Sequence, residues 1–215
     1  ICKEGCKDFI LGEPTTENSK FTIECLTAAA DMAMNHSSCL VTGPLNKSII
    51  QKYIPDFNGH TEFLKKRFNA KEVLMFMTNG NMHLGIATTH IPLKDVVTKI
   101  SKDLIKNKYK LLHHGLIDIF KLISPKIAVL GINPHAGEFG TIGDEELKII
   151  MPSIEELRDE GYDAYGPISA DTVFIQNKYD SVLSMYHDQA LPVLKTIDFN
   201  KTVNITLGLP FLRIS

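Results

Sequence analysis

The sequence predicts an α/β fold, in which a layered, mostly parallel sheet is covered by helices on both faces. Two observations support this prediction: apolar runs of strand length alternate with stretches of helical periodicity, and 44% of the 215 residues are hydrophobic. Strands that are separated by helices form βαβ units, and such units build parallel sheets that are buried on both faces. A chain of this length accommodates one large α/β domain or parts of two.

Six segments have the length and the apolar content of buried strands. They are residues 38–44, 73–78, 84–90, 126–135, 179–187 and 203–208. The letters NGNM between the second and third segments also allow a hairpin. A hairpin there would make the sheet mixed rather than purely parallel.

Helical periodicity occurs in five stretches. They are residues 19–35, 61–68, 93–107, 109–123 and 144–160. Thr61 has the chemistry of a helix N-cap, and Leu64 begins the apolar face of that helix. The last helix opens with Asp144, Glu145 and Glu146, which we expect to interact favourably with the helix dipole.

Composition and charge argue against several classes of protein. The formal net charge of −2 gives no electrostatic reason to expect nucleic acid or an anionic membrane as a partner. No apolar run approaches the ~20 residues of a membrane span, and the opening letters ICKEGCKDFILGEP lack the apolar core of a signal peptide. The four cysteines form no CxxC pair, which favours free thiols and a cytoplasmic location. Neither the Rossmann glycine motif nor the P-loop motif occurs.

Three of the predicted strands end in histidine. His90, His135 and His187 follow the letters LGIATT, AVLGINP and SVLSMY. Ligands of open α/β sheets bind beyond the carboxyl ends of strands, and imidazole is the commonest side-chain ligand of zinc and similar ions. One such histidine is usually a packing or capping residue, but three on separate strands favour a metal site. Four other histidines lack this context and are interpreted as surface or helix residues: His36, His83, His113 and His114.

Further polar side chains have the chemistry of an anion site. His60 and Thr61 immediately precede or open a predicted helix, and the exposed N–H groups of a helix N-terminus suit a phosphate or a carboxylate. Lys195, Asn204 and Arg213 form a widely spaced set of donors that could hold an anionic substrate.

At these residues the sequence resembles a known family. The motifs VTGPLNK, GHTEFL, THIPL, NPHAGE, GPISADT, MYHDQALPVLK and VNITLGLPFLR occur in one order between Leu40 and Arg213. They resemble the serial motifs of 4-hydroxythreonine-4-phosphate dehydrogenase, the PdxA family of vitamin B6 (pyridoxine and pyridoxal 5'-phosphate) biosynthesis. Each motif is weak alone, and the ordered set is highly specific.

The resemblance implies a two-domain α/β/α fold similar to isocitrate and isopropylmalate dehydrogenases. It implies NAD- or NADP-dependent oxidation of 4-phosphooxy-L-threonine to a 3-oxo acid, which decarboxylates to 3-amino-2-oxopropyl phosphate. The family's metal ligands, for zinc, magnesium or cobalt, fall on His90, His135 and His187. Its substrate-binding residues fall on a second set: His60, Thr61, Lys195, Asn204 and Arg213. No residue is assigned to the dinucleotide.

Three residues are candidates for catalysis within such a site. Lys195 is suited to proton transfer, and equally to simple ion pairing with the substrate. Asp171 and Asp188 could orient a ligand or relay a proton, because carboxylates commonly fix the tautomer of a metal-binding imidazole. A divalent ion at the histidines would act as a Lewis acid on the substrate.

The resemblance also predicts the organisation of the chain. We expect residues 1–58 to be the remainder of a first α/β domain, and residues 59–215 to form a domain for substrate, metal and dimerisation. The family's glycine-rich opening segment and its closing cofactor segment have no counterpart in the sequence. The dinucleotide half is therefore expected to be incomplete, and the isolated chain to turn over poorly.

The resemblance further implies a homodimer whose active site lies at the subunit interface. We expect His90 and His135 from one chain to meet His187 of the other. Three alternatives stay open at this point. The substrate could be a threonate or erythronate 4-phosphate, with a 2-hydroxy group in place of the 2-amino group. The protein could also be a zinc hydrolase, or a non-catalytic fragment.

Overall fold

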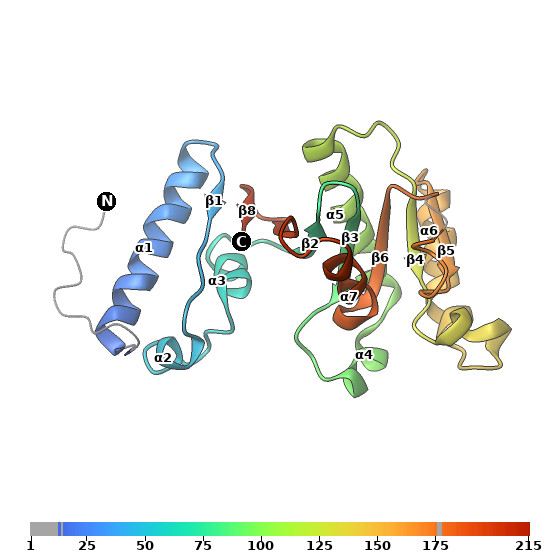
Figure 1. Cartoon of the computed structure of the whole chain (residues 1–215), viewed down its shortest axis with the longest axis horizontal. Coiled ribbons are helices and arrows are strands. Elements are labelled where there is room, and N and C mark those ends of the chain that lie inside the picture. Colours follow the sequence, from blue (N-terminus) through green and yellow to red (C-terminus); the bar gives the residue numbers. More distant parts are fainter. Residues whose placement is uncertain (1–12, 14, 176–177) are drawn as a thin grey trace. The chain divides into compact units, whose positions relative to one another are not determined.

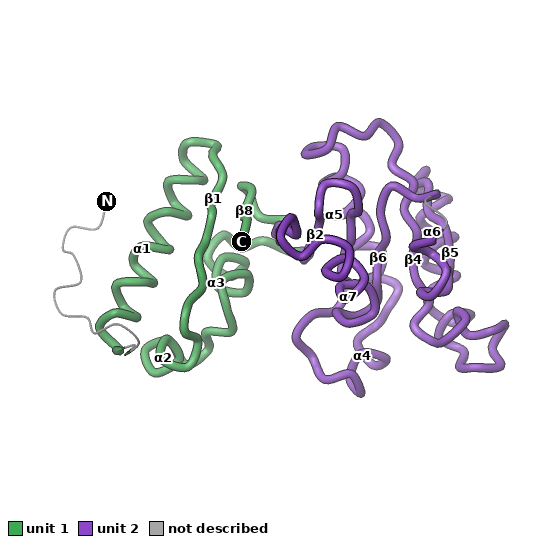
Figure 2. Tube along the Cα trace, in the orientation of Figure 1, with its two compact units in different colours: residues 1–73, 208–215 green, residues 74–207 purple. Residues whose placement is uncertain are grey.

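The computed structural model describes residue 13, residues 15–175 and residues 178–215. The chain divides into two compact units (Figure 2). The first unit runs to Val73 and includes Gly208–Ser215, and the second unit is Leu74–Leu207. Within the described residues, no helix is long and apolar enough to span a membrane.

The described residues of the first unit form three helices and a pair of short strands (Figure 1). In chain order they are α1 (Thr16–Asn35), β1 (Leu40–Val41), α2 (Lys47–Gln51), α3 (His60–Arg67) and β8 (Arg213–Ile214). The two strands pair in parallel, with Leu40 opposite Arg213. This pairing is the reason that the last residues of the chain belong to the first unit.

The core of the first unit lies under one face of α1. Ile23, Leu26, Ala30 and Ala33 recur at the spacing of one helical face and are buried. They belong to an apolar cluster that α2, α3 and the strand pair complete with further buried residues: Leu40, Ile50, Phe57, Leu64 and Phe211. The first unit therefore has a hydrophobic core of its own.

The second unit is built on a mixed six-stranded sheet. In spatial order its strands are β7 (Val203–Leu207), β2 (Leu74–Thr78), β3 (His83–Thr88), β6 (Ser181–Tyr186), β4 (Ile127–Leu130) and β5 (Ala164–Ile168). Strand β2 is antiparallel to both β7 and β3. Strands β3, β6, β4 and β5 are mutually parallel, so that their carboxyl ends share one edge.

Helices cover both faces of this sheet. The helical elements are α4 (Leu93–Lys99), α5 (Lys102–Phe120), η1 (Pro134–Gly140), η2 (Glu146–Ile150), α6 (Met151–Asp159) and α7 (His187–Ile197). On β6, Val182 packs in the apolar cluster that contains Leu191 of α7. The next residue, Leu183, lies beside Leu112 of α5 around Gly85. Because successive strand residues point to opposite faces, α7 and α5 cover different faces.

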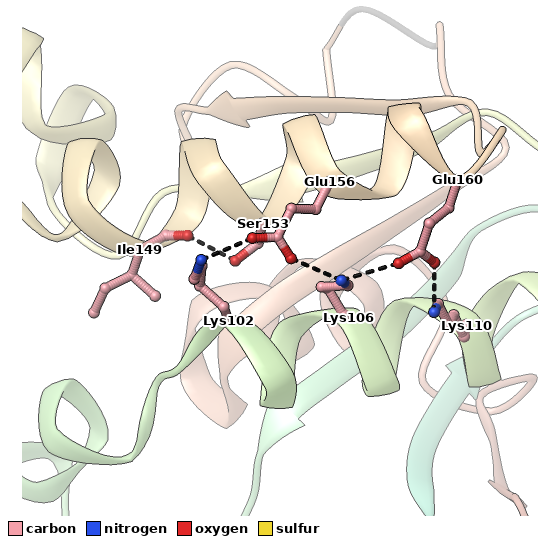
Figure 3. A network of polar contacts seen from close by, with 7 residues as sticks. All are labelled: Lys102, Lys106, Lys110, Ile149, Ser153, Glu156 and Glu160. Carbon is pink, nitrogen blue, oxygen red and sulfur yellow. Dashed lines mark hydrogen bonds and ion pairs between the residues drawn. The ribbon is translucent and has the colours of Figure 1, made fainter.

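Helices α5 and α6 are joined by a ladder of ion pairs (Figure 3). Glu156 accepts from Lys102 and Lys106, each at 2.7 Å, and Glu160 pairs with Lys106 at 2.9 Å and with Lys110 at 2.5 Å. The side chains of both glutamates are more than a third exposed. Exposed pairs of this kind add little stability, so the ladder mainly selects how the two helices align.

Each of the six predicted segments contains a strand, although β1 and β4 are much shorter than the segments predicted for them. The β2–β3 pair is the hairpin that makes the sheet mixed. The sequence did not reveal β5 or β8. Strand β5 carries the letters AYGPI, whose glycine and proline are unfavourable in strands. Strand β8 has only two residues, too few for a pattern.

Two predictions about helix ends were wrong. The helices predicted over residues 93–107 and 109–123 were expected to be separated near residue 108. They are separated instead at Ile100, whose ψ of 126° is extended. Ser101 then caps α5 by accepting from the N–H of Leu104 at 3.2 Å. The N-cap of α3 is Gly59, with φ at 138°, and Thr61 is the second residue of the helix. A glycine replaces the expected hydroxyl because the chain enters this helix with positive φ.

The compact units also differ from the domain boundary expected after residue 58. Residues 59–73 pack with the first unit, as do residues 208–215. The physical reason is that Leu64 on α3 is fully buried in the core of the first unit. The β1–β8 pairing similarly brings back the end of the chain.

Candidate active site

The three strand-end histidines of the second unit follow neighbouring strands. In the order β3-β6-β4, His90 comes two residues after β3, and His187 directly follows β6. His135 lies in η1, beyond β4. The rings of His90 and His187 are 6.2 Å apart between centroids. Within one chain the structure therefore brings these two predicted ligands together at the carboxyl edge of the sheet.

Two of the three histidines have a left-handed backbone. The φ angle is 55° at His90 and 51° at His135. A residue other than glycine in this region is uncommon, and such conformations cluster at active sites and ligand clamps. Backbone strain thus coincides with two positions that were selected for their chemistry.

Element η1 is a left-handed turn. From His135 to Phe139 five successive residues have positive φ, between 44° at Glu138 and 78° at Gly137. Each L-residue in this region costs roughly 1–2 kcal/mol relative to the right-handed one. Because only one of the five is glycine, contacts from outside the turn must offset this cost.

Glu146 supplies such contacts. Its Oε1 accepts from the N–H groups of Ile132 and Asn133, at 2.7 and 2.8 Å, and its Oε2 accepts from Nδ2 of Asn133 at 2.9 Å. The same Nδ2 donates to Oε2 of Glu145 at 2.7 Å. Glu146 is 2% exposed. The expectation that Glu146 serves the helix dipole is therefore incomplete, since its carboxylate binds the chain just before His135.

His187 begins α7, where its ring meets the next side chain. Nδ1 of His187 lies 2.7 Å from Oδ1 of Asp188. With Nδ1 engaged, Nε2 is the nitrogen through which His187 would bind a metal. Gln189 secures the same turn, because it accepts from the N–H of Met185 at 2.7 Å and donates to the carbonyl of Gly131 at 2.5 Å. This side chain links the ends of β6 and β4.

A cavity of about 340 Å³ opens at this edge of the second unit. Its lining includes His135, Asp171 and Asp188. Ser169 donates a hydrogen bond to Asp171, and this bond, with backbone N–H groups and the nearby His135, lowers the pKa of Asp171. A second cavity of about 130 Å³ is lined by His187 and Asp188. Three predicted site residues thus share one cavity, and Asp188 borders both.

Among the described residues, no three His, Cys, Asp or Glu side chains of one chain are arranged to hold a metal ion. The donor types nevertheless fit a divalent transition metal, because neutral imidazoles with carboxylate partners are its usual ligands.

The first unit brings together His60, Thr61 and Arg213. His60 and Thr61 open α3. Burial, followed by the positive charges of Arg213 and Lys47, lowers the pKa of His60 from 6.5 to about 4. Lys47 lies at the start of this helix as well, since its Cε would be 3.5 Å from a Cβ placed on Gly59. The result is a helix N-terminus with a neutral imidazole and two cations.

Arg213 is buried, with 4% of its surface exposed. Its Nε and Nη2 donate to Oγ1 of Thr42, at 3.1 and 2.6 Å. Burial lowers the pKa of Arg213, and the charge of Glu62 acts in the opposite direction. A desolvated guanidinium is a strong partner for a carboxylate or a phosphate.

The other two predicted substrate residues lie in the second unit. Lys195 is exposed in the last turn of α7, with Nζ 5.7 Å from the ring centroid of Phe199. Eight residues separate it from His187, about 12 Å along the helix axis. Asn204 lies on β7, opposite Met77. Within this unit, neither residue lines the cavity that contains His135.

One interpretation of a histidine needs correction. His83 was expected on the surface or in a helix, but it begins β3 and is half-buried. Its Nδ1 lies 2.8 Å from Oγ1 of Thr78, and its ring stands 4.3 Å from that of Phe120. Burial lowers its pKa. His83 is therefore a packing residue of the second unit.

Known proteins resemble this chain along nearly its whole length. The sequence model described as pyridoxal phosphate biosynthetic protein PdxA matches residues 2–215. The chain belongs to the PdxA family. It is 45% identical over 211 residues to a curated 4-hydroxythreonine-4-phosphate dehydrogenase of Salmonella arizonae, covering 96% of this chain and 64% of that protein.

Solved structures of PdxA proteins have the same fold. The crystal structure of 4-hydroxythreonine-4-phosphate dehydrogenase from Klebsiella pneumoniae matches with a TM-score of 0.91 and 33% identity, over 97% of this chain and 64% of that one. A terephthalate 1,2-cis-dihydrodiol dehydrogenase from Burkholderia xenovorans matches with a TM-score of 0.76 at 23% identity, over 97% and 67%, which shows a shared fold alone. The chain thus spans about two thirds of these relatives' lengths.

Sequence reasoning missed the roles of three side chains that support the candidate site in this PdxA chain. Glu146 and Gln189 hold the segments next to His135 and His187, and Thr42 accepts from Arg213. Thr42 and Gln189 lie within motifs quoted above, and Glu146 lies eight residues after the NPHAGE motif. The sequence shows polar letters there, but burial and bonding partners depend on residues far along the chain.

Proposed function

We propose that the protein is an NAD- or NADP-dependent dehydrogenase that oxidises the C3 hydroxyl of 4-phosphooxy-L-threonine in vitamin B6 biosynthesis. Two findings support this proposal: the chain belongs to the PdxA family, and the curated relative is named 4-hydroxythreonine-4-phosphate dehydrogenase. The observation that carries it is structural: histidines with carboxylate partners line the sheet edge of the second unit, while buried Arg213 and neutral His60 form an anion site in the first.

His90, His135 and His187 are the residues that would hold a divalent metal, with zinc, magnesium and cobalt as the candidate ions. When bound, such an ion polarises a substrate oxygen as a Lewis acid. Asp188 fixes the tautomer of His187 through Nδ1. Asp171, held by Ser169 and near His135, stays ionised and faces the same cavity.

The phosphorylated end of the substrate matches the chemistry of the first unit. Arg213 would pair with an anionic oxygen. His60 has a pKa of about 4, so at neutral pH its ring is uncharged and still has an N–H to donate. Thr61 adds a hydroxyl at the start of α3. Lys195 and Asn204 supply the remaining proposed contacts, with Lys195 also the candidate for proton transfer.

A comparison of substrates tests the proposed activity. The product of the complete reading frame encoding this chain should reduce NAD or NADP with 4-phosphooxy-L-threonine. It should act poorly on threonate and erythronate 4-phosphates, which carry a 2-hydroxy group. Preference for the 2-hydroxy acids would assign a related dehydrogenase. Metal-dependent hydrolysis without nucleotide would indicate a zinc hydrolase, and ligand binding without turnover a non-catalytic protein.

The proposed site is shared between the subunits of a homodimer, with His90 and His135 from one chain and His187 of the other. A competing pairing exists, because His90 and His187 of one chain have ring centroids 6.2 Å apart. Complementation distinguishes the two. His90→Ala and His187→Ala homodimers should both be inactive.

In a mixed dimer of these variants, a shared arrangement leaves one site with all three histidines. Activity should then return when the two variants are unfolded and refolded together. If one chain supplied every ligand, each site of the mixed dimer would lack one histidine. No activity would then return, even in a refolded sample in which mass spectrometry detects heterodimers.

A further inference from the structure

We propose that Glu146 is a positioning residue, which holds the left-handed turn η1 so that His135 is presented to a metal ion. The inference rests on the metal-binding part of the proposed function. Glu146 would not itself touch metal or substrate. It would act through Asn133, the residue that precedes η1.

The contacts of Glu146 converge on one short segment. Its carboxylate accepts three hydrogen bonds at 2.7–2.9 Å, two from the main-chain N–H groups of Ile132 and Asn133 and one from the Asn133 side chain. All of these donors lie within three residues of His135. A carboxylate has enough lone pairs to accept them together, and being 2% exposed it has little competition from water.

The turn needs an anchor of this kind because hydrogen bonds near its two ends do not remove the strain of its left-handed backbone. Ala136 donates to the carbonyl of Asn133 at 3.2 Å, and Ile142 donates to that of Gly137 at 3.1 Å. Four of the five left-handed residues carry side chains, and such residues persist in this conformation only where the surroundings enforce it. Glu146 enforces it at the entry to the turn.

The carboxylate is also closely enclosed by the segment it binds. A Cβ added to Gly137 would lie 2.5 Å from Oε2 of Glu146. A Cβ on Gly131 would lie 2.7 Å from Cα of Ala136 and 3.0 Å from Oε1 of Glu146. The positive φ of 78° at Gly137 adds a second reason for glycine there. The main chain can therefore wrap around Glu146 only with glycine at these positions.

The decisive experiment compares Glu146→Gln with Glu138→Gln. The two substitutions make the same chemical change, but Glu138 is exposed on the turn. In Glu146→Gln an amide N–H₂ replaces one acceptor and faces the amide of Asn133. We expect the affinity for Zn²⁺, titrated alone, to fall 10–100-fold, the usual effect of losing an outer partner of a metal ligand. Glu138→Gln should bind Zn²⁺ like the unmodified protein.

Hydrogen exchange gives a readout that does not require metal. In the metal-free protein, Glu146→Gln should accelerate amide exchange in residues 131–140 and leave residues 181–190 unchanged. Asn133→Asp should also accelerate exchange in residues 131–140, because it places a carboxylate against Glu146. This variant keeps the test available if Glu146→Gln fails to fold. Faster exchange throughout the second unit, with a general loss of thermal stability, would show a merely structural role and overturn the inference.

His135→Ala separates this inference from the proposed function. If His135→Ala loses Zn²⁺ affinity while Glu146→Gln and Asn133→Asp keep it, Glu146 does not position the ligand and the inference is rejected. If His135→Ala keeps its Zn²⁺ affinity, the proposed metal site is wrong. The inference that Glu146 positions His135 for a metal then falls with it, even where exchange shows that Glu146 holds the turn.

Discussion

The two units contribute proposed site residues of opposite electrostatic character. In the first unit, burial and then the positive charges of Arg213 and Lys47 lower the pKa of His60 to about 4. In the second unit, carboxylates accompany the histidines: Asp188 meets His187, Asp171 lies near His135, and Glu146 binds the chain before His135. The same side chain is thus prepared for two uses, as a neutral donor to an anion and as an oriented ligand for a cation.

This difference shows that burial and the charged partners of an imidazole together decide its chemistry. Positive neighbours disfavour the protonated ring, whereas a carboxylate at one nitrogen orients the other. The α5–α6 ladder provides a useful reference, because its glutamates are equally charged but exposed (Figure 3). The predictions below alter each region in turn.

The largest effect is expected for Arg213 in the cationic region. Arg213→Ala should weaken binding of the phosphorylated substrate by roughly 2–5 kcal/mol, the usual cost of truncating a buried, hydrogen-bonded charge. Calorimetric titration measures this loss. Arg67→Ala is the control, because Arg67 is in the same unit but forms an exposed pair with Asp31. If the two variants bind the phosphorylated substrate with equal affinity, Arg213 is not part of the anion site.

A smaller effect is expected for Asp188 in the carboxylate-supported region. Asp188→Asn should lower Zn²⁺ affinity about 10–100-fold, because the amide no longer fixes the tautomer of His187. Asp159→Asn, an exposed residue of α6, serves as the matched control. If both proteins bind Zn²⁺ alike, the contact at Nδ1 of His187 has no role in metal binding.

The protonation of His60 provides a pH test. Because its folded pKa lies below the ordinary 6.5, the unfolded chain binds more protons between pH 6.5 and about 4. Its contribution to stability is therefore complete above pH 6.5 and is lost as the pH falls toward 4. Proton NMR of the His60 ring should show a midpoint near 4. Arg213→Met should raise that midpoint, and Lys47→Met should raise it less.

Burial is the largest cause of the low pKa of His60. Both substitutions should consequently leave the midpoint below 6.5. A ring that titrates at its ordinary value in the unmodified protein would contradict the proposed neutral donor.

The smallest effect is expected in the ladder. Bonds from Lys102 and Lys106 lower the pKa of Glu156 to about 2. The ionised form is therefore favoured in the folded protein, and this contribution is lost as the pH falls from 4.5 to about 2. Glu156→Gln should reduce the melting temperature slightly at low salt and hardly at all at high salt. A large loss that persists in high salt would mean that the ladder is not simply an exposed ion network.

The sequence by itself predicted the alternation of strands and helices, and it provided the candidate site residues. Periodicity is a local property, so the apolar runs before His90, His135 and His187 were sufficient to place each histidine after a strand. The ordered motifs were sufficient for the PdxA family. Short or irregular elements such as β5 and β8 left no such pattern.

Only the tertiary structure decided which of these residues meet and what holds them. The closeness of His90 to His187 arises from the pairing of β3 with β6 in the sheet. The burial of Glu146 and the left-handed turn around His135 are likewise seen only in the folded chain. Strand order and burial depend on contacts between residues far apart in the chain. From the sequence alone, a glutamate that interacts with a helix dipole cannot be distinguished from one that anchors the backbone. Glu146 is an anchor because folding brings the N–H groups of Ile132 and Asn133 to its carboxylate.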